Sequence, residues 1–400
     1  MNIKKDKDNV TYLENYGKKL NKKKLLIVGI VGIIVLILII GFIVYSNNEQ
    51  FRIFCDTYIL RKEIEEDNLS KIEIDDVNVS NVFAYSNYIA IIKDNVLNKY
   101  NTSGNEETQI KMEITKPLIV TNESYAIIAE QAGQKAYLIK NSDIVWEKTL
   151  EGNIAKVNVN SNGYVSIILS GTSYKSVIIL YDEKGNELFK TYLSSTIAVD
   201  SDISIDNKYL SFAEVNTAGT LRQSNIKIIS VEKAKQSPSD SIIYTYKANE
   251  NSLIVDIKYQ KNKLVCMYDD AICVIENKEN KQIASLNETG KKITFCDIGL
   301  YDFAVRTVEE SNGLFSTKTA VELINTSSLK NNVYNLTGSI KELYCYGDRL
   351  GVNLGSEVHF IDINGWLVKK YISSQEIRGI VMNNKIAGII YKNKIEIVNL

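Results

Sequence analysis

Residues that could carry acid–base, nucleophilic or zinc chemistry are sparse in this chain. Its 400 residues include one histidine, His359, which alternates with Val358 and Phe360 as side chains do in a β-strand. With no second histidine or nearby cysteine, a zinc site or a Ser-His-Asp triad would depend on this residue alone. We therefore interpret His359 as a strand residue with a satisfied hydrogen bond, and we predict no catalytic residue and no metal site.

The acidic series Asp200-x-Asp202-x-x-x-Asp206 is spaced in a way that suggests calcium binding. It lacks, however, the central glycine and the closing glutamate of a calcium loop. Much of it also falls within a predicted strand, where residues two apart share one face. The chain contains no P-loop, G-x-G-x-x-G or G-x-S-x-G motif either. These patterns predict a protein that is not an enzyme and has no resident cofactor.

Among the five cysteines, the sequence pattern brings one pair directly opposite each other. In the stretch LVCMYDDAICVI, a two-residue turn places Cys266 directly across from Cys273, so a cross-strand disulfide is possible there; reduced core cysteines are the alternative. Cys296 and Cys345 fall in the first strands of neighbouring repeats, where we expect small buried apolar residues. Cys55 follows the apolar run by about ten residues, available for intermolecular pairing, and the odd total argues against a full disulfide framework.

A run of 21 residues without charge, from Leu25 to Tyr45, decides where the rest of the chain is placed. As a helix it would be about 30 Å long, the thickness of a bilayer's hydrocarbon core. The run is too long for the apolar region of a signal peptide, and the residues after it lack a small-x-small cleavage pattern. We therefore predict an uncleaved single-pass anchor in the cell membrane.

The charges that flank this run predict its direction. Residues 1–24 carry eight lysines against three acids, a net charge of +5, and the lysines nearest the run are Lys18, Lys19, Lys22, Lys23 and Lys24. Positive charge beside a spanning helix stays in the cytoplasm, so we expect residues 46–400 to lie outside it. A basic cluster beside a membrane is more simply a topology signal than a nucleic-acid site, and we expect no nucleic-acid partner.

A repeated unit fills the remainder of the chain: an apolar strand, a short polar turn and a second alternating strand, often followed by a hairpin with Asp, Asn or Gly at its tip. Eight such units begin 36 to 52 residues apart, at Val82, Leu118, Val157, Asp202, Ile254, Ile293, Glu342 and Gly379. Repeats of this length with about four strands each are typical of a β-propeller. The pattern predicts an all-β fold with eight blades, and seven blades is the alternative.

The two ends of the repeat region favour a closed ring. The last unit supplies only three strands, while an orphan strand, Lys71–Ile74, precedes the first unit. Donating this strand to the last blade would remove an exposed sheet edge. The segment Phe51–Asn68 would then be a connector, in which the stretch RKEIEED forms a short helix or an outer strand. The predicted organisation is a cytoplasmic tail (1–24), a transmembrane helix (25–45), a connector (46–70) and a propeller (71–400).

The second hairpins of several repeats resemble one known type of blade. They read VIILYDEKGNELFKTY (177–192), AYLIKNSDIVWEKTL (136–150) and VHFIDINGWLVKKY (358–371). An alternating strand, a D-x-x-G turn and then an aromatic residue resemble the blades of quinoprotein-dehydrogenase-like (PQQ/WD40-like) propellers. The resemblance implies that Trp146 and Phe189 dock between blades, and Lys369 occupies the equivalent position in the next-to-last blade. It covers residues 71–400.

A short basic tail, one span and a divergent propeller together are similar to an uncharacterised family of bacterial membrane-anchored propeller proteins. That family implies no known activity. The quinoprotein likeness raises the question of a quinone enzyme, but both tryptophans (Trp146 and Trp366) fall in second hairpins away from the axis, and no vicinal cysteine pair is present.

We therefore expect a non-catalytic binding or scaffold module outside the cytoplasm, for an envelope protein or an extracellular ligand. The longest inserts, which would form a binding rim if they emerged on one face, are 216–225, 233–241 and 309–319. The alternative is a divergent quinone- or metal-dependent propeller enzyme, which predicts clustered carboxylates at the axis. A third possibility is signalling across the membrane, which would need a cytoplasmic or membrane partner because the tail is short.

Overall fold

The computed structural model describes residues 22–64, 69–76, 78–122, 124–219, 222–311 and 317–400. It divides into two compact units, residues 1–61 and residues 62–400, which are treated separately below.

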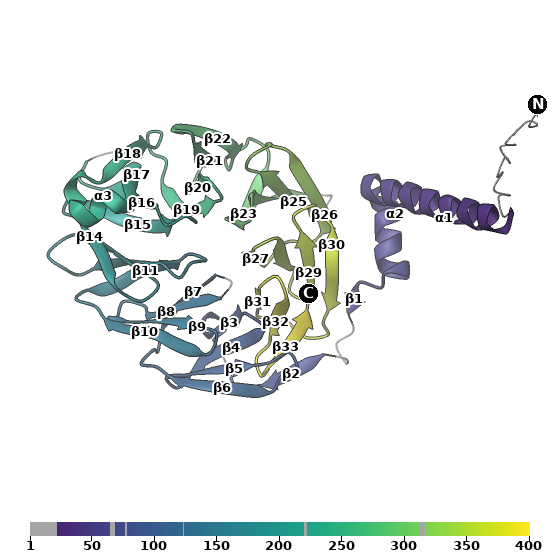
Figure 1. Ribbon diagram of the computed structural model, residues 1–400, viewed down its shortest axis with the longest axis horizontal. Coiled ribbons are helices and arrows are strands. Elements are labelled where there is room, and N and C mark those ends of the chain that lie inside the picture. The colour runs from purple at the N-terminus through teal and green to yellow at the C-terminus, as the bar shows by residue number, and fades with distance from the viewer. Residues whose placement is uncertain (1–21, 65–68, 77, 123, 220–221, 312–316) are drawn as a thin grey trace, which may run out of the picture. The chain divides into compact units, whose positions relative to one another are not determined.

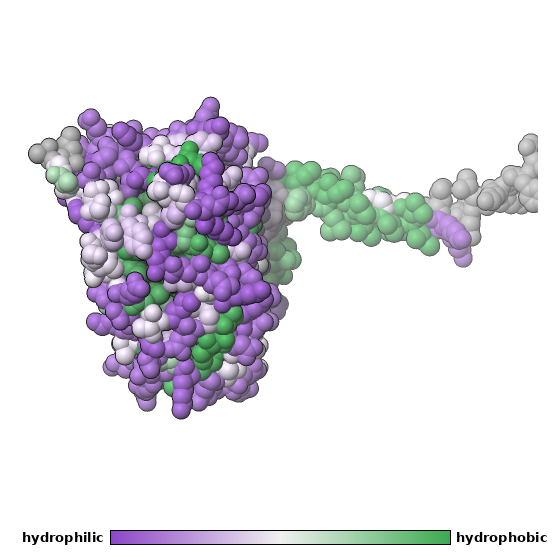
Figure 2. All heavy atoms as spheres, turned by 60° about the vertical axis from the view of Figure 1, so that its left-hand side comes forward, coloured by the Kyte–Doolittle hydropathy of each residue, from purple (hydrophilic) through white to green (hydrophobic). Residues whose placement is uncertain are grey.

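The first unit is helical. The helix α1 (Lys22–Asn47) contains the charge-free run, and its most apolar stretch is not buried against any other part of the chain that the structure describes. Figure 2 shows its continuous hydrophobic surface. In the described part of the chain, α1 is the one helix long and apolar enough to cross a membrane. Its length and composition thus fit the predicted span, and of the five flanking lysines, Lys18 and Lys19 lie outside the described residues.

Two short helices follow: α2 (Glu49–Phe54) and the π-helical turn η1 (Cys55–Ile59). The side chain of Asn48 begins α2 by accepting a hydrogen bond from the backbone N–H of Phe51 at 3.0 Å, as a cap should. Cys55 is buried in this unit, with 8% of its surface exposed. The prediction that its thiol would be available for intermolecular pairing is therefore wrong, because the chain stays helical past the span instead of extending as a linker.

The second unit is an eight-bladed β-propeller, as predicted (Figure 1). Blade 1 consists of β3 (Val82–Tyr85), β4 (Tyr88–Lys93), β5 (Val96–Tyr100) and β6 (Glu106–Lys111), and blade 2 of β7 (Pro117–Asn122), β8 (Tyr125–Glu130), β9 (Lys135–Lys140) and β10 (Asp143–Thr149). Blade 3 consists of β11 (Asn153–Val159), β12 (Val165–Ser170), β13 (Ser176–Tyr181) and β14 (Glu187–Leu193), and blade 4 of β15 (Thr196–Ile203), β16 (Tyr209–Asn216), β17 (Gln223–Ser230) and β18 (Ile242–Lys247).

Blades 5 to 8 follow the same order from the axis outwards. They are β19 (Ile254–Gln260), β20 (Lys263–Tyr268), β21 (Ala271–Glu276) and β22 (Glu279–Ser285); β23 (Lys292–Leu300), β24 (Phe303–Ser311), β25 (Thr317–Asn325) and β26 (Asn331–Thr337); β27 (Glu342–Tyr346), β28 (Arg349–Asn353), β29 (Glu357–Asp362) and β30 (Leu367–Ile372); and β31 (Gly379–Met382), β32 (Ile386–Ile390) and β33 (Lys394–Asn399). Short helical turns are η3 (Val79–Asn81), α3 (Val231–Gln236) and η4 (Pro238–Asp240).

Two strands that precede blade 1 complete the last two blades. The strand β2 (Ser70–Glu73) pairs antiparallel with β33 and becomes the fourth strand of blade 8. The strand β1 (Glu63–Ile64) pairs parallel with β30 and adds a fifth strand to blade 7. Of the two structures left open for the stretch RKEIEED, its described part therefore forms an outer strand, because β30 offers an unpaired edge.

Neighbouring blades pack on each other through aromatic side chains of the outer strands. Trp146 on β10 lies 5.8 Å from the ring of Tyr181 in the next blade, measured between ring centroids. It also covers Gly185, which has a φ of 83° and where a Cβ would come within 2.8 Å of the indole, so only glycine fits. Phe189 on β14 is packed among buried residues that include Leu210 and Phe212 of blade 4.

In blade 7 a different residue fills the space between blades. Lys369 donates a hydrogen bond to the backbone carbonyl of Asn399 in blade 8. The buried ring is Tyr371, two residues further on, which donates to Glu396 and lies 2.5 Å, oxygen to oxygen, from Tyr391. The D-x-x-G alignment therefore places the docking aromatic of blade 7 two residues too early.

The inserts predicted as a binding rim do not share one face. Strands alternate in direction within a blade, so turns after the first and third strands lie at one end of the propeller. Turns after the second strand lie at the other end. We name the end at which the inner strands finish the mouth end, and the opposite one the far end. The insert 233–241 joins β17 to β18 at the mouth end, whereas the described residues of 216–225 and 309–319 adjoin the ends of second strands at the far end; residues 220–221 and 312–316 of these inserts lie outside the described part of the chain.

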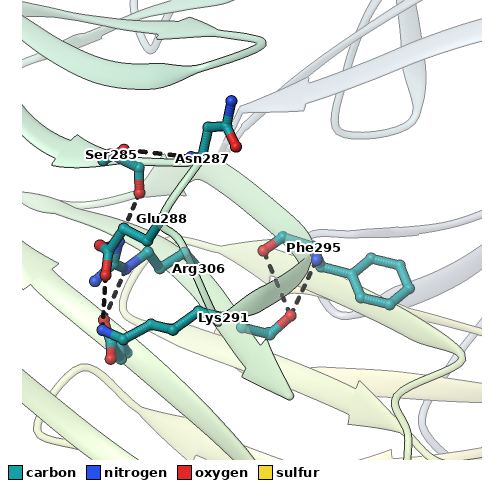
Figure 3. Close-up of polar contacts among 8 residues, drawn as sticks. Ser285, Asn287, Glu288, Lys291, Phe295 and Arg306 are labelled. Carbon is teal, nitrogen blue, oxygen red and sulfur yellow. Dashed lines mark hydrogen bonds and ion pairs between the residues drawn. The ribbon is translucent and has the colours of Figure 1, made fainter. Parts of the chain in front are cut away.

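A buried arginine fastens the connection between blades 5 and 6 (Figure 3). Arg306 on β24 donates to the carboxylate of Glu322 at 2.7 Å and to the backbone carbonyl of Ser285 at 2.6 Å, and it pairs with Glu288 in the connecting loop. Glu288 is itself paired with Lys291 at 2.7 Å. The loop is thus held by a charged network, which a single long cation can organise because the guanidinium has five donors.

The closing strand β2 should contribute to the stability of the whole ring. Ile72, 2% exposed, is packed in the core between blades 8 and 1, so Ile72→Ala should lower the free energy of unfolding by roughly 2–4 kcal/mol. Urea denaturation of the full chain in detergent, followed by tryptophan fluorescence, measures this. The control is Glu73→Ala, at an exposed site on the same strand, which should change stability by no more than about 0.5 kcal/mol. Equal effects of the two substitutions would contradict closure by β2.

Candidate functional site

The inner strands direct polar side chains toward the axis of the propeller, where they enclose a hollow of about 260 Å³. We name it the axial hollow. Its lining comes from inner strands of blades 2, 3, 5, 6 and 7, since first strands in a propeller face the axis. The charged and amide residues of this lining are Asn122, Lys156, Asn158, Asp256, Lys258 and Asp297.

Two buried carboxylates of β15 join blade 4 to blade 5 beside this hollow. Asp200 accepts a hydrogen bond from the backbone N–H of Ile257 at 3.1 Å, and Asp202 accepts one from that of Tyr259 at 2.6 Å. The two side chains are 0% and 3% exposed. Asp206 lies apart from them in the following turn, where it accepts from the Ser204 hydroxyl at 2.7 Å. The series read as a possible calcium motif thus connects two blades.

Charges around the axial hollow are paired across blades. The Lys156 ammonium lies 3.5 Å from Oδ1 of Asp200. Asp202, Asp256 and Asp200 together raise the pKa of Lys258, so this lysine stays charged although burial opposes it. The hollow therefore holds fixed positive and negative groups, and it is suited to polar or charged ligand groups more than to an apolar molecule.

Burial and like charge shift the acids of the hollow toward their neutral forms. Burial raises the pKa of Asp200 well above its ordinary value, and the neighbouring Asp256 carboxyl group raises it further. Burial likewise raises the pKa of Asp297 to about 6, although the backbone N–H of Gly299 donates to Oδ1 at 2.5 Å and opposes the rise. Both carboxyl groups are thus held toward their protonated forms, and the pKa of Asp297 falls near 6.

The axial hollow continues into two larger hollows at the mouth end, of about 440 and 360 Å³. Tyr301, in the turn between β23 and β24, lines all three and is 47% exposed. Tyr346 lines the axial hollow and the smaller mouth hollow. Ile205, also 47% exposed, lines the larger one. An aromatic and apolar rim therefore surrounds the entrance to a charged interior.

Side-chain amides fix this entrance by bridging adjacent blades. The amide of Asn122 donates to the carbonyl of Val159 at 3.3 Å, and that of Asn383 donates to Ser86 at 2.8 Å. Gln260 is buried, and its amide donates to the carbonyls of Ile298, Leu300 and Phe303 at 2.8–3.0 Å. Each bond runs from the end of one inner strand to the next blade. These bonds hold turns of adjacent blades to each other at three places around the mouth end.

Sequence patterns did not single out Asp256, Lys258, Asp297 or Tyr301. Asp256 and Lys258 alternate within the apolar strand at Ile254, and this was the available signal, since charged residues at a spacing of two on a first strand face the axis.

The structure places the remaining predicted residues as follows. His359 lies on blade 7, outside the axial hollow. Its Nδ1 shares a hydrogen bond with the hydroxyl of Tyr334 on blade 6, 2.8 Å away. Cys266 and Cys273 are directly opposed in register as free thiols. Cys296 is half-buried, and Cys345 lines the axial hollow. Cys296 and Cys345 are each packed against a hydrophobic core cluster, as expected, and Cys345 also lies beside Asp297.

Two kinds of bound group, a metal ion and a quinone, can be tested against the residues of the axial hollow. Among the described residues, no group of three or more His, Cys, Asp or Glu side chains is arranged to hold a metal ion. The carboxylates do gather near the axis, as the enzyme alternative requires. The axial hollow offers no tryptophan and no vicinal cysteines as a ceiling over a quinone ring, so its residues do not fit that cofactor.

Comparisons with known proteins agree with the fold. Residues 60–400 match the model of a family described as "Family of unknown function (DUF5711)". The chain is similar to the C-terminal WD40 domain of Sif2, with a TM-score of 0.56 and 12% identity over 83% of this chain and 98% of that chain. It is similar to Sqt1 from Chaetomium thermophilum, with a TM-score of 0.52 and 11% identity over 84% and 99%.

A third similar structure is BamB from Moraxella catarrhalis, with a TM-score of 0.49 and 11% identity over 83% of this chain and 99% of that chain. At these identities the likeness shows the fold alone. No curated protein matches the chain.

The raised pKa of Asp297 predicts a pH-dependent cost to folding. Its pKa is about 6 in the folded protein against 3.8 ordinarily, so the folded state loses stability as pH rises from about 4 to about 6. Asp297→Asn keeps an acceptor for Gly299 and cannot ionise. It should be equal to the parent near pH 4 and more stable by roughly 1–3 kcal/mol near pH 7, in urea denaturation at each pH.

A matched control has the opposite sign. Burial alone would raise the pKa of Asp206, but hydrogen bonds from Ser204 and Lys208 outweigh it and lower the pKa. Asp206→Asn should therefore be less stable than the parent near pH 7, with the difference shrinking as pH falls below the ordinary pKa. If Asp297→Asn shows this same pH profile, the Asp297 side chain is not in the desolvated state described above.

Proposed function

The chain belongs to the DUF5711 family, a family of unknown function, and we propose that it is a membrane-anchored, non-catalytic binding or scaffold module whose partner is another protein of the cell envelope. The observation that supports this most is at the mouth end, where three adjoining hollows meet at the exposed Tyr301. Concave sites with an aromatic rim and a few charged groups are typical binding sites.

The partner is expected to place a polar or charged segment into this entrance. Tyr301 and Ile205 supply exposed apolar area at the rim, where tyrosine is favoured in protein interfaces. Asp256, Lys258 and Asp297 lie further in and supply charges of both signs. A partner loop with an apolar contact flanking one charged side chain would complement both zones, because the hollow cannot receive a folded domain.

An enzyme is the second candidate, favoured by one observation. Asp200 is held toward its protonated form beside the Asp256 carboxyl group, and an acid whose pKa is raised by burial is a group that acid–base catalysis can use. The metal-dependent form of this proposal needs ligands beyond those the described residues bring together. We rank it second, because Asp200 is fully buried and its Oδ2 already bridges two blades.

The binding proposal predicts site-specific cross-linking at the mouth end. A photoreactive phenylalanine analogue introduced in place of Tyr301 or Ile205, in the full chain in its own cells, should form one protein adduct at both positions. The control is Val255, which is 47% exposed like the other two but lies at the start of β19, toward the far end. An adduct from Val255 alone, or equally from all three, would contradict binding at the mouth. If no protein adduct forms at any position, the binding proposal is contradicted, and a small-molecule ligand or the enzyme candidate is favoured instead.

The proposed placement has its own support and its own test. A charge-free helix preceded by lysines favours a cytoplasmic N-terminus and a propeller outside. Alkaline phosphatase folds actively only where disulfides form, so its fusion after Leu400 should be active and its fusion before Met1 inactive. Replacing Lys18, Lys19, Lys22, Lys23 and Lys24 by glutamine should lower the activity of the C-terminal fusion. Activity of the N-terminal fusion alone would mean the reverse orientation.

A further inference from the structure

The helical segment that follows the span exposes an unusual density of large apolar side chains. Between residues 51 and 60, the exposed fractions are 37% for Phe51, 58% for Ile53, 51% for Phe54, 71% for Tyr58, 64% for Ile59 and 55% for Leu60. Leaving this much apolar surface in water is unfavourable by roughly 25 cal/mol for each Å². Contiguous exposed patches of this kind mark contact with a partner or a membrane.

The polar groups of the segment are withdrawn from this surface. Asp56 is buried, 4% exposed, and accepts a hydrogen bond from the Tyr45 hydroxyl at the end of α1, at 2.6 Å. Arg52 is half-buried, and Cys55 is buried beside Asp56. The contact between Tyr45 and Asp56 folds the segment back onto the end of α1. It hides the acid that would otherwise oppose insertion into an apolar phase.

The segment is too short to cross a bilayer and too apolar to remain in water. A helix of 10–12 residues is roughly 15–18 Å long, about half of the hydrocarbon thickness. Helices with an apolar face and aromatic side chains lie in the interface plane, and phenylalanine and tyrosine suit the boundary between headgroups and acyl chains. The apolar run of α1 ends at Tyr45, separated from this segment by residues 46–50, and Tyr45 is hydrogen-bonded to Asp56 within it, so lipid is the neighbour that continuity supplies.

We infer that residues 51–60 lie in the headgroup region of the bilayer and form a second membrane contact, with lipid as the occupant of their exposed apolar surface. This inference rests on the proposed membrane anchoring by α1. A bilayer contact extends the anchored part of the chain from residue 45 to residue 60 and leaves little free chain before β1.

The test measures how close single tryptophans lie to lipid. The full chain, reconstituted in phosphatidylcholine vesicles, carries Ile59→Trp, or Ile34→Trp in the middle of α1, or Val255→Trp on the propeller; all three parent residues are exposed. Signal from Trp146 and Trp366 is subtracted with the unsubstituted chain. Acyl chains brominated near the headgroup should reduce the Ile59→Trp fluorescence by about half, as expected for an interfacial residue, and should not affect Val255→Trp.

The outcomes separate the two proposals. If bromine near the middle of the acyl chains quenches Ile34→Trp while neither brominated lipid quenches Ile59→Trp, the anchor stands and the second contact is overturned. If Ile34→Trp is not quenched either, the anchoring proposal itself fails. Protection of Ile59→Trp from both brominated lipid and aqueous iodide also overturns the inference, since protein would then cover the segment. Leu60→Trp, 55% exposed in the parent, repeats the test should Ile59→Trp not fold.

Discussion

Closure of the ring is the constraint on which the rest of the propeller depends. Each blade packs only on its two neighbours, so the position of every inner strand is fixed once the first and last blades are joined. That joint is the β2–β33 ladder together with one buried carboxylate. Glu396 is 0% exposed and pairs with Lys394 at 2.7 Å and with Lys71 of β2 at 3.5 Å, while Tyr371 of blade 7 donates to it. A buried charge requires such partners, which here come from β33 itself, from β30 of the preceding blade and, more than three hundred residues earlier in the chain, from β2.

Polar side chains at the axis also have two roles. Asp200, Asp202, Gln260 and the mouth asparagines all bond to the backbone of a neighbouring blade, so polar side chains at the axis hold blades together and also set the electrostatics of the hollow. Their structural bonds leave Asp256, Asp297 and Lys258 facing the open space. A ligand would thus meet a charged surface that is already organised, and binding would need little rearrangement.

The sequence was informative about whatever is periodic. Alternating apolar strands and short polar turns predicted the eight blades, and the three-stranded last unit with an orphan N-terminal strand predicted the closure. The lining of the axial hollow could not be predicted in the same way. The register of each inner strand decides which of its residues face the axis, and bulges such as that between Ala198 and Asp200 shift this register. The predicted binding rim of three inserts was wrong for a related reason. The length of a loop can be read from a sequence, but the end of the propeller at which it emerges depends on which strand of the blade it follows.

The origin of the closing strand has a consequence for the order in which the molecule is made. A ribosome produces residues 70–73 more than three hundred residues before their partner strand, 394–399. The ring therefore cannot close until residues 394–399 have been made, and the edge of every newly made blade stays open to the next. Contacts this distant in sequence form slowly because of the entropy of closing the intervening loop. Until those residues are made, the propeller of this nascent chain is an open arc, the state in which a chaperone would find it.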